Sequence, residues 1–198
     1  MFGRKRKILV QGDTVYLFTP TRDCADEFLA MTTASQGFHR PWVFPAVDSR
    51  RFRAYLDRLE EGRTYGFCLG RLEDDALIGV VNINDVILGG LRGGSLGYYI
   101  GTDYARRGYM TEGLALVLDH AFTALDLHRI EANVQPANLA SLALIKRLGF
   151  RKEGFSPAYL QIDGVWRDHE RWAILADEWL SANGAETIEP PRLRSTLA

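Results

Sequence analysis

The sequence predicts a single α+β domain in which about four helices flank a mixed, mainly antiparallel sheet of about six to seven strands. Residues 64–101 contain three consecutive apolar segments of strand type with short turns between them, which is typical of an antiparallel meander. Residues 107–148 alternate two amphipathic helices with a strand. Two further strand segments flank Asp163-Gly164, a dipeptide that favours hairpin turns. The length of 198 residues fits one domain.

The chain begins with a basic arm, residues 1–13, that carries the run GRKRK. This run has two possible interpretations, a solvated arm or a segment that contacts RNA or the ribosome. A strand is expected at residues 14–20, and a helix begins at about Asp23, its expected N-cap. The loop HRPWVFP, residues 39–45, contains two prolines and is not helical throughout. Asp48 or Ser49 then caps a helix that ends near Glu61.

The centre of the chain supplies the meander and the longest helix. Its strands are expected at residues 64–72, 76–86 and 95–101, with a glycine-rich linker at 88–94 before the third. A helix from about Arg107 to Leu125 follows at once. Its apolar residues recur at the spacing of one helical face, which predicts that this face packs on the sheet; they are Met110, Leu114, Val117, Leu118, Ala121, Phe122 and Leu125.

The remaining elements complete the sheet. A strand is expected at residues 129–134, followed by an amphipathic helix that begins at Asn138 and is stopped by Gly149. Strands near residues 152–161 and 166–175 form the closing hairpin. The folded domain is expected to span residues 14–180. Residues 181–198 lose periodicity, contain two prolines and are expected to be a disordered tail.

Composition argues against several function classes. The net charge of −1 provides no broad basic surface for DNA, and no apolar stretch approaches the about 18 residues that a membrane span needs. Cys24 and Cys68 lack metal-type spacing, and none of the 4 histidines has the spacing of a metal site or a catalytic triad. We therefore expect a cytoplasmic protein with no metal, with core or surface thiols and structural histidines.

The segment YARRGYMTEG carries the strongest functional signal. Gly108 stands between a strand and a helix, where the first helical turn offers unpaired N–H groups and a positive dipole end to an anion. The segment has neither the GxxxxGK[ST] nor the GxGxxG pattern of nucleotide-binding loops. Arg106 and Arg107 add positive charge, although solvation of both side chains remains an alternative. The geometry of helix entry would by itself also explain a single glycine.

Three segments together resemble one family. YARRGYMTEG resembles the acyl-CoA pyrophosphate loop of the GCN5-related N-acetyltransferases (GNAT), and HRIEANVQPANLASLALIKRLGF is similar to the strand and helix that follow it there. EGFSPAYLQIDGVWRDH resembles the closing strands of the RimJ/RimL-like branch, the ribosomal-protein-alanine N-acetyltransferases. The resemblance covers about Thr14 to Leu175. Ala105 and Met110 depart from the family pattern in the loop, where backbone amides bind the phosphates and only Gly108 allows their close approach.

This resemblance implies a GNAT fold, acetyl-CoA as co-substrate and a set of site residues. The N–H of Ile100 would hold the oxyanion of the tetrahedral intermediate, and the Ser141 hydroxyl would protonate the departing thiolate. Asn138 would bind the pantetheine arm, although its plain interpretation is an N-cap. The residues implied to bind the co-substrate are Tyr98, Tyr99, Ile100, Arg106, Arg107, Gly108, Tyr109, Met110, Thr111, Asn138 and Ser141.

The sequence identifies neither the general base nor the acceptor. Tyr98, Tyr159 and Glu112 are weak candidates for the base, and the region before the last hairpin turn has no carboxylate until Asp163. We expect acetyl transfer by direct attack in a ternary complex, with the N-terminal amine of a protein, first a ribosomal protein, as acceptor. A small amine as acceptor, and a non-catalytic module that binds acyl-CoA or the ribosome, are the alternatives. The sequence leaves monomer and homodimer open.

Overall fold

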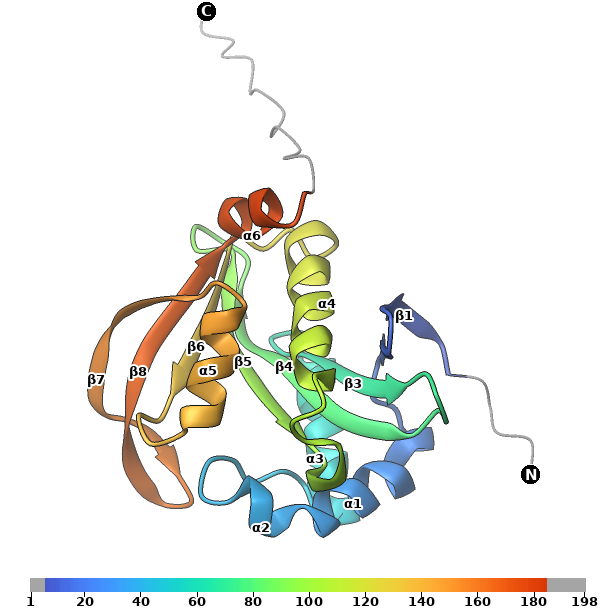
Figure 1. Ribbon diagram of the computed structural model, residues 1–198. Helices are drawn as coiled ribbons and strands as arrows, with labels where there is room; N and C mark the ends of the chain where they lie inside the picture. The colour runs from blue at the N-terminus through green and yellow to red at the C-terminus, as the bar shows by residue number, and fades with distance from the viewer. Residues whose placement is uncertain (1–5, 185–198) are drawn as a thin grey trace, which may run out of the picture.

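The computed structural model describes residues 6–184 of the chain. Figure 1 shows a central sheet with helices on both sides. The strands are β1 Ile8–Gln11, β2 Val15–Phe18, β3 Tyr65–Arg71, β4 Leu77–Ile87, β5 Gly93–Ile100, β6 Arg129–Val134, β7 Arg151–Ile162 and β8 Val165–Leu175. The α-helices are α1 Ala25–Ala34, α2 Gln36–His39, α3 Ser49–Glu60, α4 Tyr109–Thr123, α5 Leu139–Arg147 and α6 Ala176–Ala182. Two 3-10 turns, Arg22–Cys24 and Thr102–Tyr104, complete the described elements.

The eight strands form one sheet in the order β1-β2-β3-β4-β5-β6-β8-β7. Every neighbouring pair is antiparallel except β5 and β6, which run parallel. Their pairing runs from Gly93 opposite Arg129 to Leu96 opposite Ala132, whereas β5 continues to Ile100. Figure 1 shows the two strands side by side near α6 and well separated toward α2. The sheet therefore opens at its centre, beyond Leu96.

Two apolar clusters hold the helices on the two faces. The larger cluster joins the sheet to α4, α5 and α6 through buried side chains such as Leu114, Ile145 and Trp179. The smaller cluster joins the other face to α1 and α3 through Phe28 and Phe52. Burial of an aromatic or aliphatic side chain contributes about 1.5–3 kcal/mol, so these contacts fix the helices on the sheet.

The predicted α+β fold with a mixed, mainly antiparallel sheet is confirmed, and the structure adds elements that the sequence analysis lacked. The arm expected at residues 1–13 contains β1, which pairs with β2 at the sheet edge. The one-turn helix α2 and the C-terminal α6 were also not expected. Residues 185–198 of the expected tail lie outside the described residues.

The predicted helix ends are mostly confirmed. Asp48 caps α3 by accepting a hydrogen bond from the Arg51 N–H at 2.9 Å. Gly149 ends α5 with a positive φ of 85°. The prediction for α1 is wrong: Asp23 lies in a 3-10 turn, and α1 begins at Ala25 with Cys24 as N-cap. Within residues 6–184, no helix has both the length and the apolarity that crossing a membrane requires.

Candidate active site

The turn into α4 offers backbone donors at the open end of the sheet. Gly108 is the N-cap of α4 and has a φ of 87°, a left-handed conformation that glycine adopts without strain. The first helical hydrogen bonds run from the Thr111 and Glu112 N–H groups to the Gly108 carbonyl. The N–H groups of Tyr109 and Met110 precede these bonds and lie at the positive end of the helix dipole. A Cβ at position 108 would meet no atom within 4 Å, so the fold itself requires only the backbone conformation there.

A cavity of about 480 Å³ extends from this turn along α5. The structure brings every residue predicted to bind the co-substrate to its wall: Tyr98, Tyr99, Ile100, Arg106, Arg107, Gly108, Tyr109, Met110, Thr111, Asn138 and Ser141. We call it the donor cavity. The Met110 side chain is buried in the core, so the backbone of that residue is what it offers to a ligand. Arg106 and Arg107 are joined there by Arg147 of α5, which gives the cavity three guanidinium groups.

The end of β5 presents backbone groups to the gap in the sheet. The Gly101 N–H donates to the Ile78 carbonyl at 2.8 Å, which makes Ile100 and Gly79 a non-hydrogen-bonded pair of the β4–β5 ladder. In an antiparallel ladder the polar backbone groups of alternate residues point to opposite edges. Those of Tyr98 and Ile100 therefore point away from β4, toward the diverging β6. An extended ligand can pair with this edge as an added strand does.

His39 occupies part of that edge and was not identified as a site residue from the sequence. Its Nε2 donates a hydrogen bond to the Ile100 carbonyl at 2.8 Å, and its ring lies edge-on to Tyr99 at 5.3 Å between centroids. The residue is 3% exposed, and its Nδ1 is buried without a partner among residues 6–184. Burial lowers the pKa of His39, against the raising effect of the bond to Ile100. A neutral His39 therefore holds the end of β5 in place.

Ser141 and Tyr98 meet where β5 faces α5. The Tyr98 hydroxyl lies 2.5 Å from the Ser141 hydroxyl, which connects the two elements across the gap. Burial raises the pKa of Tyr98 to about 12, while the bond to Ser141 lowers it by less. Asn138 caps α5 by accepting a hydrogen bond from the Ser141 N–H at 3.2 Å, as its plain interpretation predicted. Two hydroxyl groups in contact can pass a proton to a leaving group at the same place.

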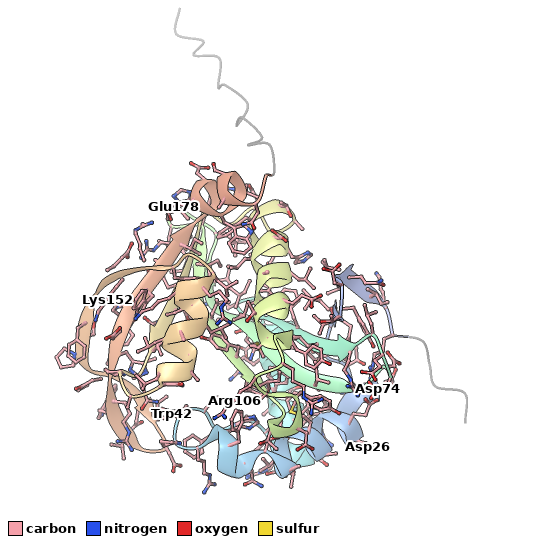
Figure 2. The ribbon with its side chains drawn as sticks, in the orientation of Figure 1. Asp26, Trp42, Asp74, Arg106, Lys152 and Glu178 are labelled. Atoms are coloured by element: carbon pink, nitrogen blue, oxygen red, sulfur yellow. The ribbon has the colours of Figure 1, made fainter. Side chains whose placement is uncertain are left out.

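A second cavity, of about 570 Å³, lies on the other side of this contact. Trp42, Val43, Tyr98, Asn138 and Ser141 line both cavities, so the two meet at the Tyr98–Ser141 contact. We call the second one the acceptor cavity. Figure 2 shows Trp42 and Arg106 at the end of the molecule where α5 and α4 begin. Trp42 lines both cavities.

The acceptor cavity contains charges of both signs. Glu131 lines it and accepts hydrogen bonds from Arg129 at 2.9 Å and from Arg171 at 2.8 Å. Burial would raise the pKa of Glu131, but the bonds from the two arginines outweigh this and lower it. Asp85 and Arg58 also line the cavity and are of opposite charge. A paired, ionised Glu131 is a poor proton acceptor, and the cavity as a whole is not acidic.

The structure also gives the positions of the other residues that the sequence analysis considered for the site. Glu112 lies outside both cavities and accepts a hydrogen bond from the Thr14 N–H at 2.8 Å, which ties α4 to the start of β2. His169 and Tyr159 line the acceptor cavity. Among the described residues, no three histidine, cysteine or acidic side chains form a group that could hold a metal ion.

Comparisons with known proteins show which family the chain resembles. The family described as "Acetyltransferase (GNAT) domain" matches residues 15–151. The chain is 35% identical over 175 residues to the probable N-acetyltransferase YjcK of Bacillus subtilis, covering 84% of this chain and 97% of that protein. It is 38% identical over 150 residues to the [ribosomal protein uS5]-alanine N-acetyltransferase of Escherichia coli, covering 72% of this chain and 77% of that protein. The structure titled Mycobacterium smegmatis RimJ in complex with CoA-disulfide aligns with a TM-score of 0.75 and 32% identity, covering 86% of this chain and 89% of that one.

Proposed function

The chain belongs to the GNAT family and is an acyl-CoA-dependent N-acetyltransferase, and we propose that its acceptor is the N-terminal α-amino group of a protein, with ribosomal proteins first among the acceptors to test. The observation that carries this proposal is the charge balance of the acceptor cavity. Its carboxylate Glu131 is paired with Arg129 and Arg171, so a polycationic small amine finds no surplus of negative charge there. The name of the Escherichia coli relative supports the same class of acceptor.

The chemistry of the acceptor favours an α-amine over a lysine. An α-amino group has a pKa of about 7.8 and a lysine one of about 10.4, so the α-amine is neutral at pH 7 some hundreds of times more often. That difference is equivalent to about 3.5 kcal/mol of the activation barrier. A site whose Glu131 carboxylate is already paired with two arginines suits the acceptor that needs less help to lose its proton.

The residues around the cavity junction can perform each step of direct transfer. The acceptor amine attacks the thioester carbonyl of acetyl-CoA, and the N–H of Ile100, on the open edge of β5, donates to the oxyanion. Collapse of the intermediate breaks the C–S bond, and the Tyr98–Ser141 pair donates a proton to the thiolate. Gly108 and the three arginines of the donor cavity, Arg106, Arg107 and Arg147, bind the phosphates of coenzyme A. No enzyme-bound acetyl group is needed.

A thiol-release assay tests the acceptor class. Purified protein and acetyl-CoA are mixed with a peptide that begins with alanine, with the same peptide N-terminally blocked and carrying one lysine, or with a small amine such as a polyamine. Turnover on the free N-terminus alone, with mass spectrometry placing the acetyl group on the first residue, is the expected result. Turnover only on small amines would overturn the protein acceptor, whereas coenzyme A binding without any turnover would favour the non-catalytic alternative.

A further inference from the structure

His169 lies in the acceptor cavity although the sequence offered no role for it. The residue belongs to β8, opposite Ser156 of β7, and is one position beyond the last pair of β8 with β6, Glu170 opposite Val134. It is 2% exposed and lines the cavity that meets the donor site at Tyr98 and Ser141. An almost fully buried histidine on a cavity wall has to have its polar atoms satisfied by the protein or by a ligand.

The hydrogen bond of His169 determines which ring nitrogen is available. Nδ1 lies 2.9 Å from the Arg167 carbonyl oxygen, which can only accept, so Nδ1 carries the hydrogen and donates it. In the neutral ring, Nε2 is then a lone-pair acceptor. Among residues 6–184, no group forms a hydrogen bond with this Nε2, and the residue borders the cavity. A fixed tautomer with an available Nε2 is the arrangement that proton abstraction requires.

The surroundings of His169 keep the ring neutral. Burial lowers its pKa, the bond to Arg167 and the charge of Asp168 raise it by less, and the charge of Arg171 lowers it further. From β7, the Tyr159 ring lies edge-on at 6.0 Å between centroids, and Arg171 stands over the same ring at 4.3 Å. At pH 7 the imidazole therefore carries no charge and can accept a proton.

Three other titratable groups of the site, on Glu131, His39 and Tyr98, are less suited to this task. Glu131 is held ionised by two arginines. The Nε2 of His39 is hydrogen-bonded to the Ile100 carbonyl, and its Nδ1 is enclosed by protein. Neither nitrogen of that ring can therefore take a proton from the acceptor amine. Tyr98 stays protonated because its pKa is about 12, which suits an acid rather than a base.

We propose that His169 is the general base of the reaction, taking the proton of the acceptor ammonium group on Nε2. This inference rests on the proposed function. The ammonium group transfers one proton to His169, and the neutral amine attacks the acetyl carbonyl. A second proton leaves the nitrogen of the tetrahedral intermediate as the C–S bond breaks, and it reaches the coenzyme A thiolate through Ser141 and Tyr98. The imidazolium returns its proton to solvent, so the sum is amide, free thiol and one released proton.

Two variants separate the base from a structural histidine. In His169→Asn, the amide N–H retains the donor to the Arg167 carbonyl but Nε2 is lost, whereas His169→Gln places a polar group nearer the cavity. His120→Gln is the matched control, because His120 also has a pKa lowered by burial but packs on Phe67, away from both cavities. Melting temperature and acetyl-CoA affinity verify that each variant is folded and that its donor site is intact.

The measurement is kcat against pH from 5 to 9 with the peptide acceptor. We expect kcat at pH 7 to fall about 10²- to 10³-fold in both His169 variants. The wild-type kcat should decrease toward acidic pH as His169 becomes protonated. This decrease should be absent from both His169 variants and present in His120→Gln. A folded His169→Asn with the wild-type kcat and pH profile would overturn the assignment. If the wild type acetylates only a small amine, the protein acceptor fails, and the same comparison on that amine still decides whether His169 is the base.

Discussion

Tyr98 Oη lies 2.5 Å from Ser141 Oγ, and this contact joins β5 to α5 at the place where the donor and acceptor cavities meet. The two hydroxyl groups are held by different elements: a strand end that His39 secures, and a helix whose first turn Asn138 caps. The pair is thus fixed in position before any ligand binds. Fixed donors are more effective in transfer reactions than donors that must first be oriented.

The first prediction concerns this pair as a proton donor. Ser141→Ala and Tyr98→Phe are each expected to lower kcat by about 10- to 100-fold with little change in acetyl-CoA affinity. Because the two hydroxyl groups act together, the double variant should lose less than the product of the single losses. Steady-state kinetics gives kcat, and calorimetry gives the acetyl-CoA affinity, for the wild type, the two single variants and the double variant. Strictly multiplicative losses would show that the two groups act independently.

The second prediction separates two reasons for glycine at position 108. Gly108→Ala should destabilise the fold by about 1–2 kcal/mol because alanine resists the positive φ, whereas Gly108→Asn should cost less because asparagine tolerates it. Both should bind coenzyme A more weakly, since either Cβ enters the space in front of the turn. Thermal melting and calorimetry measure the two effects. Wild-type affinity for coenzyme A in Gly108→Asn would mean that binding depends only on the backbone conformation at position 108.

The third prediction concerns Arg147. Arg147→Gln should weaken acetyl-CoA binding about tenfold, equivalent to about 1.4 kcal/mol, by removing one charged donor to the phosphates. Binding of acetyl-pantetheine, which carries no phosphate, should not change. Arg50→Gln removes the same charge from an exposed residue outside both cavities and is the control. Equal losses for both donor substrates would place Arg147 away from the phosphates.

The fourth prediction is a pH dependence of stability at Glu131. Its pKa is lowered in the folded state by Arg171 and Arg129, so its stabilising contribution is present above the unfolded pKa of about 4.5 and is lost as the pH falls through the folded pKa. The difference in melting temperature between wild type and Glu131→Gln should therefore shrink between pH 6 and pH 3. A difference that stayed constant over this interval would mean that the pairing does not shift the pKa.

Sequence reasoning could group residues that are close together in the chain. Gly108 and the arginines before it are neighbours in the chain, and Asn138 and Ser141 lie in one helical turn, so their spacing alone placed them together. The acceptor side depends on the sheet order: β8 lies between β6 and β7, which brings His169 to the same cavity as Glu131 from far along the chain. No local spacing encodes that proximity. β1 was missed because its four residues adjoin the basic run.

The last prediction concerns Asn138, whose two roles call for different atoms. Its Oδ1 accepts from the Ser141 N–H and caps α5, while its Nδ2 makes no hydrogen bond within residues 6–184 and can donate to the pantetheine arm in the donor cavity. Asn138→Ser supplies another capping oxygen without the amide N–H, so the melting temperature should stay near that of the wild type while KM for acetyl-CoA rises several-fold. Asn138→Ala should lose about 1 kcal/mol of stability in addition.

The serine variant is the informative one, because loss of the cap would also displace Ser141 and confuse the two roles. Melting curves and KM for acetyl-CoA, measured on the same preparations, separate them. A wild-type KM for acetyl-CoA in Asn138→Ser would mean that Asn138 only caps α5 and does not bind the pantetheine arm. Pantetheine binding would then depend on the open edge of β5, where the backbone of Tyr98 and Ile100 faces the gap, and on the residues of the donor cavity around it.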